Sequence, residues 1–265
     1  MSNKCCICGT VRNCGKYLDT IFSNMEKLGK VFEDYRIILY YDSSDDDTLA
    51  KLKVYKEKND KMFFYVNQSE MLSYRTHRLA LGRNYCISHI KENYKDYEFF
   101  IVMDCDDICA RNININSLLL YLKRDTWDCL TFQHPKGYYD NWALSKPPYV
   151  ISCHHFSNSG LGARLIDGII KKRNRNRNRS LIPCLSAFNG IAIYRTQKFI
   201  DCIYDGNFRL NYIPKKLIDE NIKYAGYPIL NKNNTIEDCE HRHFHFQAVF
   251  KNNARIRISP LCLFM

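Results

Sequence analysis

The feature that most constrains the fold is the alternation of short apolar runs with longer amphipathic stretches through the first half of the chain. The apolar runs, which are typical of strands, are residues 5–10, 35–41, 61–66 and 98–103. The stretches between them, which are typical of helices, are residues 15–28, 46–59 and 76–93. Strands that alternate with helices of this length predict crossover connections, and so an α/β fold with a mainly parallel sheet flanked by helices.

The second half of the chain is less regular. Residues 128–133 and 187–195 are expected to form further strands, residues 138–144 an aromatic loop or helix start, and residues 255–264 an apolar close. The sequence contains no internal repeat and no linker-like stretch. We therefore expect a single domain over residues 1–265 whose C-terminal half elaborates the sheet.

Composition narrows the class of protein. Of 265 residues, 46% are hydrophobic and 14% aromatic, which predicts a globular protein. The 13 cysteines are scattered, odd in number and set within apolar runs, so we expect reduced, packed thiols in a cytosolic setting. Cys5-Cys6-Ile7-Cys8 suggests either a zinc knuckle or a first buried strand, and the absence of a second cysteine pair favours the strand. No signal peptide and no transmembrane segment is predicted, so a cytoplasmic protein is expected.

Six of the chain's net +11 charges lie in residues 171–179, so the remainder carries only +5. A low-complexity run of Lys, Arg and Asn predicts a solvated, mobile loop over residues 171–180. Such a run also permits weak electrostatic association with anionic surfaces. A specific nucleic-acid partner is not expected, because it would leave the acidic segment described next without a role.

An apolar run, Phe99-Phe100-Ile101-Val102-Met103, ends abruptly in Asp104, Asp106 and Asp107. Ionised carboxylates are costly to bury, so they should lie at the open end of this strand, where they repel one another unless a cation lies between them. Asp104 and Asp106 could both reach one Mg²⁺ or Mn²⁺ ion. The alternative is a helix cap at Asp107 with the other two carboxylates solvated.

Asp42 and Ser43 follow the second predicted strand in the same way. Ligands of parallel sheets bind at the carboxyl ends of the strands, so these side chains are expected in the same crevice as Asp104 and Asp106.

In their order along the chain, several short segments resemble nucleotide-sugar-dependent glycosyltransferases of the GT-A fold. The segments are 11–13 (Val-Arg-Asn), 41–46 (Tyr-Asp-Ser-Ser-Asp-Asp), 75–84 (Arg-Thr-His-Arg-Leu-Ala-Leu-Gly-Arg-Asn), 104–106 (Asp-Cys-Asp), 139–144, 186–195 and 239–241. The later segments resemble capsule-type, CAP59-like mannosyltransferases and related small viral or bacterial enzymes. The resemblance extends over about residues 5 to 260 and implies a Rossmann-like GT-A sheet.

The resemblance implies a nucleotide-sugar-binding half over residues 1–135. Asp104 and Asp106 match the Asp-X-Asp motif, in which the first carboxylate often faces the ribose and the second binds Mn²⁺ (or Mg²⁺). Asp42 matches the position that touches the nucleoside, with a helix-capping role as the alternative, and Arg12 lies in the matching segment after the first strand. An arginine of the third helix, either Arg75 or Arg83, would meet the diphosphate.

Residues 136–265 would form the acceptor half. Tyr139, Asp140 and Trp142 combine aromatic faces with a carboxylate, which suits a sugar, although an aromatic core corner has the same composition. Asn189 lies in a turn whose backbone could approach a ligand closely, or in a plain β-turn.

The segment 238–245 (Asp-Cys-Glu-His-Arg-His-Phe-His) is rich in carboxylates and imidazoles. Glu240 is predicted as the general base on an acceptor hydroxyl, with Asp238 as the second candidate. His241 is predicted as the third metal ligand, ahead of His245. A zinc pair formed by the two histidines and a solvated polar segment are the alternatives.

The predicted function is a metal-dependent hexosyltransferase that acts on a nucleotide-sugar donor and a glycan or protein-linked acceptor. The alternative is a metal-dependent nucleotidyltransferase or phosphoesterase on a similar sheet, which would also use paired aspartates. The sequence contains no Gly-rich Walker-type phosphate loop, which argues against kinases and NTPases.

Overall fold

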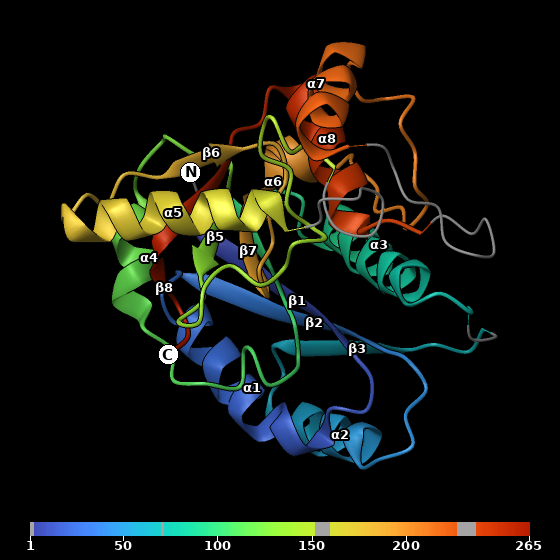
Figure 1. Ribbon diagram of the computed structural model, residues 1–265. Coiled ribbons are helices and arrows are strands. Elements are labelled where there is room, and N and C mark those ends of the chain that lie inside the picture. The colour runs from blue at the N-terminus through green and yellow to red at the C-terminus, as the bar shows by residue number, and fades with distance from the viewer. Residues whose placement is uncertain (1–2, 70–71, 152–159, 227–236) are drawn as a thin grey trace.

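The computed structural model describes residues 3–69, 72–151, 160–226 and 237–265. Within these ranges the strands form one eight-stranded sheet in the order β3-β2-β1-β4-β7-β5-β8-β6 (Figure 1). The strands are β1 (Lys4–Val11), β2 (Asp34–Tyr41), β3 (Met62–Val66), β4 (Phe99–Met103), β5 (Cys129–Gln133), β6 (Ile182–Cys184), β7 (Ile191–Arg195) and β8 (Ile256–Cys262).

The first four strands are parallel and set the position of the functional site. β1 pairs with β2 on one side and with β4 on the other, and β3 extends the sheet beyond β2. The chain therefore builds outward from β1 and then crosses to its other side to enter β4. β7 lies antiparallel between β4 and β5, while β8 is parallel to β5. The reversal between β1 and β4 leaves a crevice beyond the carboxyl ends of these strands.

Helices cover both faces of the sheet (Figure 1). One face carries α1 (Gly15–Gly29), α2 (Thr48–Lys58) and α4 (Ile115–Leu122). The other carries α3 (Arg75–Asn93), α5 (Leu161–Arg175), α6 (Thr196–Phe199) and α8 (Glu240–Asn252), with α7 (Lys215–Ala225) outside them. The predicted α/β fold with a mainly parallel sheet flanked by helices is confirmed. No helix in the described ranges combines the length and apolar composition needed to cross a membrane.

The side chains of each strand alternate between two hydrophobic cores. In β1, Cys6 and Cys8 face the α3 side, whereas Cys5 and Ile7 face the α1 side. All four are at most 1% exposed, and burial raises the pKa of the Cys5 and Cys8 thiols well above its usual range. The prediction of a buried strand rather than a zinc knuckle at Cys5-Cys6-Ile7-Cys8 is therefore confirmed.

The strand predicted over residues 187–195 is shorter in the structure. It begins at Ile191, because Asn189 and Gly190 have φ angles of 63° and 89°. This left-handed backbone cannot continue a strand and instead turns the chain toward the site.

The prediction of a mobile loop over residues 171–180 is wrong for its first half. Lys171–Arg175 forms the last part of α5, whose buried Ile166 and Ile170 anchor the helix to the core. The Tyr121 hydroxyl then donates to the Arg179 carbonyl at 2.9 Å and holds the following turn against α4. The basic run is therefore held in place from outside itself. Apolar side chains earlier in α5 anchor the helix, and Tyr121 anchors the turn that follows, although the local composition predicts a mobile loop.

Candidate active site

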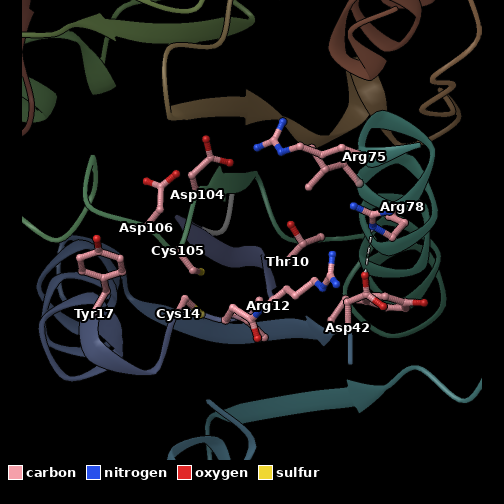
Figure 2. Close-up of a pocket in the computed structure, with 14 residues that line it drawn as sticks. Thr10, Arg12, Cys14, Tyr17, Asp42, Arg75, Arg78, Asp104, Cys105 and Asp106 are labelled. Atoms are coloured by element: carbon pink, nitrogen blue, oxygen red, sulfur yellow. Dashed lines mark ion pairs between the residues drawn. The ribbon is translucent and has the colours of Figure 1, made fainter. Parts of the chain in front are cut away.

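A cavity of about 350 Å³ opens at the carboxyl ends of β1, β2 and β4 (Figure 2). Its lining combines carboxylates, arginines and aromatic side chains from three strand ends and from α1 and α3. The lining residues are Thr10, Val11, Arg12, Asn13, Cys14, Tyr17, Tyr40, Asp42, Arg75, Arg78, Leu79, Asp104, Cys105 and Asp106. The predicted meeting of Asp42 with the Asp104 segment at one crevice is confirmed.

Hydrogen bonds between two neighbouring loops fix the rim of this cavity. The Asn13 amide donates to Ser44 Oγ at 3.0 Å, and the Asp45 amide donates to Asn13 Oδ1 at 2.8 Å. Arg12, which is exposed on the rim, donates from Nε to the Ser43 carbonyl at 3.1 Å. Asn13 has a φ angle of 49°, so its side chain reaches back across the gap between the loops. These bonds join the loop after β1 to the loop after β2.

Asp42 lies at the end of β2 with only 7% exposure. Its Oδ1 accepts bonds from the Ser43 amide at 3.1 Å and from Asn67 Nδ2 at 3.2 Å. Its Oδ2 faces Arg78 Nε at 3.6 Å, the ion pair drawn in Figure 2. The sequence alone assigns no separate role to Arg78, because α3 carries three arginines and their spacing does not show which of them lies nearest to a ligand. The structure places Arg78 next to Asp42, which can accept bonds from a nucleoside.

Asp104 and Asp106 lie immediately beyond β4 and line the cavity together. The Asp104 amide donates to the Gly190 carbonyl at 2.8 Å, and Asp106 Oδ1 accepts from the Ile108 amide at 3.0 Å. The pKa of Asp104 is raised to about 7, mainly by burial. Asp106 and Asp140 contribute to this rise, and Arg83 opposes it. Burial also raises the pKa of Asp106, and the neighbouring Asp107 adds to this shift. A cation held by both carboxylates would relieve this repulsion.

A second cavity, of about 130 Å³, adjoins the first and shares Arg75, Leu79, Asp104 and Asp106 with it. Its other walls come from α3, the 139–142 loop, the turn before β7 and the start of α8. These walls are Thr76, Arg83, Tyr139, Asp140, Trp142, Phe188, Cys239, Glu240 and His241. Most of the predicted acceptor and catalytic residues therefore lie around one space next to the acidic strand end.

Arg83 connects the two carboxylates that the sequence assigned to different roles. Its Nη2 pairs with Asp104 Oδ1 at 3.0 Å and its Nη1 pairs with Glu240. The side chain is only 4% exposed, and the guanidinium lies 4.9 Å from the Phe188 ring centroid. Both ion pairs of Arg83 are internal, and its contact with a diphosphate stays a prediction. Arg75 is exposed and lines both cavities.

His241 packs flat against Phe188, with ring centroids 3.8 Å apart. Burial lowers the pKa of His241 well below its usual range, so the ring is neutral. Neither of its ring nitrogens has a hydrogen-bond partner among the described residues. His245 lies deeper and is committed to internal bonds, with Nδ1 2.9 Å from Ser186 Oγ and Nε2 3.0 Å from Tyr194 Oη.

The predicted metal set of Asp104, Asp106 and His241 is not assembled as a three-ligand cluster. Within residues 3–69, 72–151, 160–226 and 237–265, no group of three or more His, Cys, Asp or Glu side chains is close enough to hold one ion. The two aspartates nevertheless suit Mg²⁺ or Mn²⁺, which proteins often bind through one or two carboxylates together with substrate phosphates and water. His241 stays a predicted ligand only.

Asp238 does not line either cavity, which corrects its place as second candidate base. Its Oδ2 accepts from Arg242 Nε at 2.9 Å, and both side chains are buried. Arg242 also donates from Nη1 to the carbonyls of Leu144 at 3.1 Å and Val150 at 2.8 Å. The Asp238–Arg242 pair therefore holds the start of α8 against the 142–150 segment.

Asn189 lines neither cavity but holds a loop that does. Its Oδ1 accepts from the Tyr139 amide at 3.1 Å and the Asp140 amide at 3.3 Å, while its Nδ2 donates to the Phe132 carbonyl at 2.9 Å. These three bonds fix the loop that presents Tyr139 and Asp140 to the smaller cavity.

Fold and cavity together define an α/β protein with a pocket at the switch point of its sheet, lined by carboxylates and arginines. The chain belongs to glycosyltransferase family 2, because the family described as "Glycosyl transferase family 2" matches residues 6–202. A comparison with curated proteins found no match. The resemblance to CAP59-like enzymes is not tested by this family match and stays a prediction.

Three solved structures illustrate the similarity of this chain to other proteins. The crystal structure of S. aureus TarS 1-349 is 15% identical, with a TM-score of 0.47 over 98% of this chain and 58% of that one. The same fragment in complex with UDP-GlcNAc is 16% identical, with a TM-score of 0.46 over 98% and 56%. Mannosyltransferase PcManGT from Pyrobaculum calidifontis, in complex with GDP-Man and Mn²⁺, is 10% identical, with a TM-score of 0.44 over 74% and 45%. The chain thus spans less than two thirds of each of these structures.

Proposed function

We propose that this protein is a metal-dependent glycosyltransferase that moves a hexosyl group from a nucleoside-diphosphate sugar to a hydroxyl of a glycan or protein-linked acceptor. The observation that carries the proposal is the pair of adjoining cavities that share Asp104 and Asp106. A transferase needs a donor space and an acceptor space that meet at the reacting bond. Membership of glycosyltransferase family 2 supports the same reaction class.

The larger cavity is the proposed donor site. Asp42 would accept hydrogen bonds from the nucleoside, and Arg12 and Arg75 would neutralise the diphosphate. Arg78 would hold the Asp42 carboxylate in place through their ion pair. These groups surround a space of about 350 Å³, within the range of small-molecule sites.

Asp104 and Asp106 would hold a Mn²⁺ or Mg²⁺ ion at the junction of the two cavities. A bound ion supplies Lewis-acid stabilisation of the negative charge on a departing diphosphate. The fit rests on two carboxylates whose pKa values are raised by burial and by their acidic neighbours.

The smaller cavity is the proposed acceptor site. Tyr139 and Trp142 offer aromatic faces to a sugar, and Asp140 offers hydrogen-bond acceptance. Glu240 is the proposed general base. It would take the proton of the acceptor hydroxyl as that oxygen bonds to the anomeric carbon and the bond from that carbon to the diphosphate oxygen breaks. Asp140, whose pKa is raised by burial, is the other carboxylate in this space.

A thermal-shift screen of UDP-, GDP- and ADP-linked sugars, with and without Mn²⁺, tests the donor site. Donor binding should raise the melting temperature only when Mn²⁺ is present, and Asp42→Asn should reduce the shift. Product analysis then separates this reaction from its rival. A glycosyltransferase releases a nucleoside diphosphate. Release of sugar 1-phosphate would instead indicate nucleotidyl transfer, or phosphoester cleavage where free nucleoside monophosphate is released with it.

A further inference from the structure

The solvent face of α5 carries four basic side chains, together with Gly168 and Asn174. Its exposed positions over residues 164–175 follow helical spacing and include Arg164, Lys171, Lys172 and Arg175, with Gly168 between them. Positions three and four apart share one helix face, so these cations form a row about 17 Å long. The opposite face carries Ile166 and Ile170, which are buried in the core.

No carboxylate balances this row. The only acidic residue of α5, Asp167, points inward, where its Oδ1 accepts from Gln133 Nε2 at 3.0 Å and from the Tyr138 amide at 2.9 Å. Among the described residues, none of the four exposed cations has an ion-pair partner. Like charges on one surface repel one another and lower the stability of the fold. A bound anionic partner would offset this repulsion.

The basic surface continues beyond the helix. Arg177 and Arg179 are exposed, and the Tyr121 hydroxyl bond to Arg179 holds this turn against α4. α4 ends beside the exposed Lys123, and one turn before it Leu119 is 50% exposed. In Figure 1, α4 lies beside the C-terminal half of α5. The turn after α5 therefore lies next to the last turn of α4.

We infer that the outer face of α5, with residues 177–179 and the end of α4, docks onto an anionic membrane surface. A row of cations suits a plane of anionic lipid headgroups, whose negative surface potential attracts each basic side chain. Residues 161–180 include no aromatic side chain that could stack on bases, which argues against single-stranded nucleic acid.

Docking of this face would fix the orientation of the smaller cavity. The Asp167 bond to the Tyr138 amide ties α5 to the loop that presents Tyr139 and Asp140. An acceptor carried by the same membrane would then meet the cavity in a constant geometry, a consequence that rests on the proposed function. The docking itself does not depend on the transfer reaction.

The test compares two variants of the full chain that lose four positive charges each. The first carries Arg164→Gln, Lys171→Gln, Lys172→Gln and Arg175→Gln. The matched control carries Lys27→Gln, Lys53→Gln, Lys56→Gln and Lys58→Gln at exposed sites of α1 and α2, on the other face of the sheet (Figure 1). Glutamine keeps helix propensity, and circular dichroism confirms that both variants fold.

Binding is measured by co-sedimentation with phosphatidylcholine vesicles that contain or lack phosphatidylglycerol. The wild type and the control should bind the anionic vesicles, and the α5 variant should bind them at least about tenfold more weakly. No protein should bind pure phosphatidylcholine. Equal loss in both variants would overturn the inference, as would binding of single-stranded RNA that is tighter than vesicle binding at the same salt concentration.

Discussion

Replacing Arg83 with methionine should lower the free energy of unfolding by about 3–5 kcal/mol, the usual cost of removing one partner from a buried ion pair. Methionine keeps much of the packing volume but leaves Asp104 and Glu240 without their shared cation. Their side chains are 20% and 3% exposed, so water can compensate little of the loss. Loss of the guanidinium contact with Phe188, 4.9 Å away, adds about 1 kcal/mol.

The loss should also depend on pH. Arg83 lowers the pKa of Asp104, which burial raises to about 7, so its removal raises that pKa further. An acid whose pKa is higher in the folded than in the unfolded chain destabilises the fold as pH rises through that interval. The destabilisation by Arg83→Met should therefore be larger at pH ~8 than at pH ~5, where the folded carboxyl takes up its proton.

Urea unfolding followed by circular dichroism, at several pH values and without metal, measures both effects. Arg83→Met combined with Glu240→Gln should be more stable than Arg83→Met alone, because the buried charge has gone. Arg78→Met is the matched control on the same helix. Its pair with Asp42 is longer, at 3.6 Å, and Asp42 keeps its bonds from the Ser43 amide and Asn67 when Arg78 is lost, so Arg78→Met should cost less than Arg83→Met. Equal losses in Arg83→Met and Arg78→Met, with no dependence on pH, would refute the buried bridge.

Three further predictions follow from the site. The free energy of unfolding of the metal-free wild type should fall as pH rises from about 4 to the Asp104 pKa of about 7, because only the folded chain holds that proton in this interval. Urea titrations at several pH values should show that the free energy of unfolding of Asp104→Asn depends less steeply on pH. Glu240→Gln should lower turnover by about 10²–10⁴-fold while calorimetry finds unchanged donor affinity, whereas comparable loss of both would assign it a structural role only. The four-glutamine α5 variant should bind donor with the wild-type dissociation constant, and a weaker constant would place the basic face in the donor site.

The first half of the fold could be predicted because its signals are local. Apolar runs of strand length alternate with amphipathic helices, and each strand end carries its own polar residues, as Asp42 and Asp104 do. Parallel pairing then brings these ends to one edge without further information. The gathering of Asp42, Asp104 and Asp106 around a single cavity needed only this topology.

The roles within α8 and α3 could not be predicted, because they depend on partners far away in the sequence. The segment that begins at Glu240 is as polar as an exposed surface segment, yet Arg242 is completely buried. Its guanidinium donates to backbone carbonyls about 100 positions earlier in the chain. The local sequence does not distinguish the roles of Arg75, Arg78 and Arg83, which all lie in α3. Only the packing of α8 against α3 buries Arg83 between Asp104 and Glu240.

The proposed transfer depends on a divalent ion held by Asp104 and Asp106. Release of nucleoside diphosphate from the donor identified by thermal shift should be measured for the wild type and Asp106→Asn, in Mn²⁺ and in excess EDTA. EDTA should abolish wild-type turnover and added Mn²⁺ should restore it, whereas Asp106→Asn should stay inactive in Mn²⁺ while its unfolding curve shows an intact fold. Full wild-type turnover in excess EDTA, or wild-type rates from Asp106→Asn, would contradict this dependence.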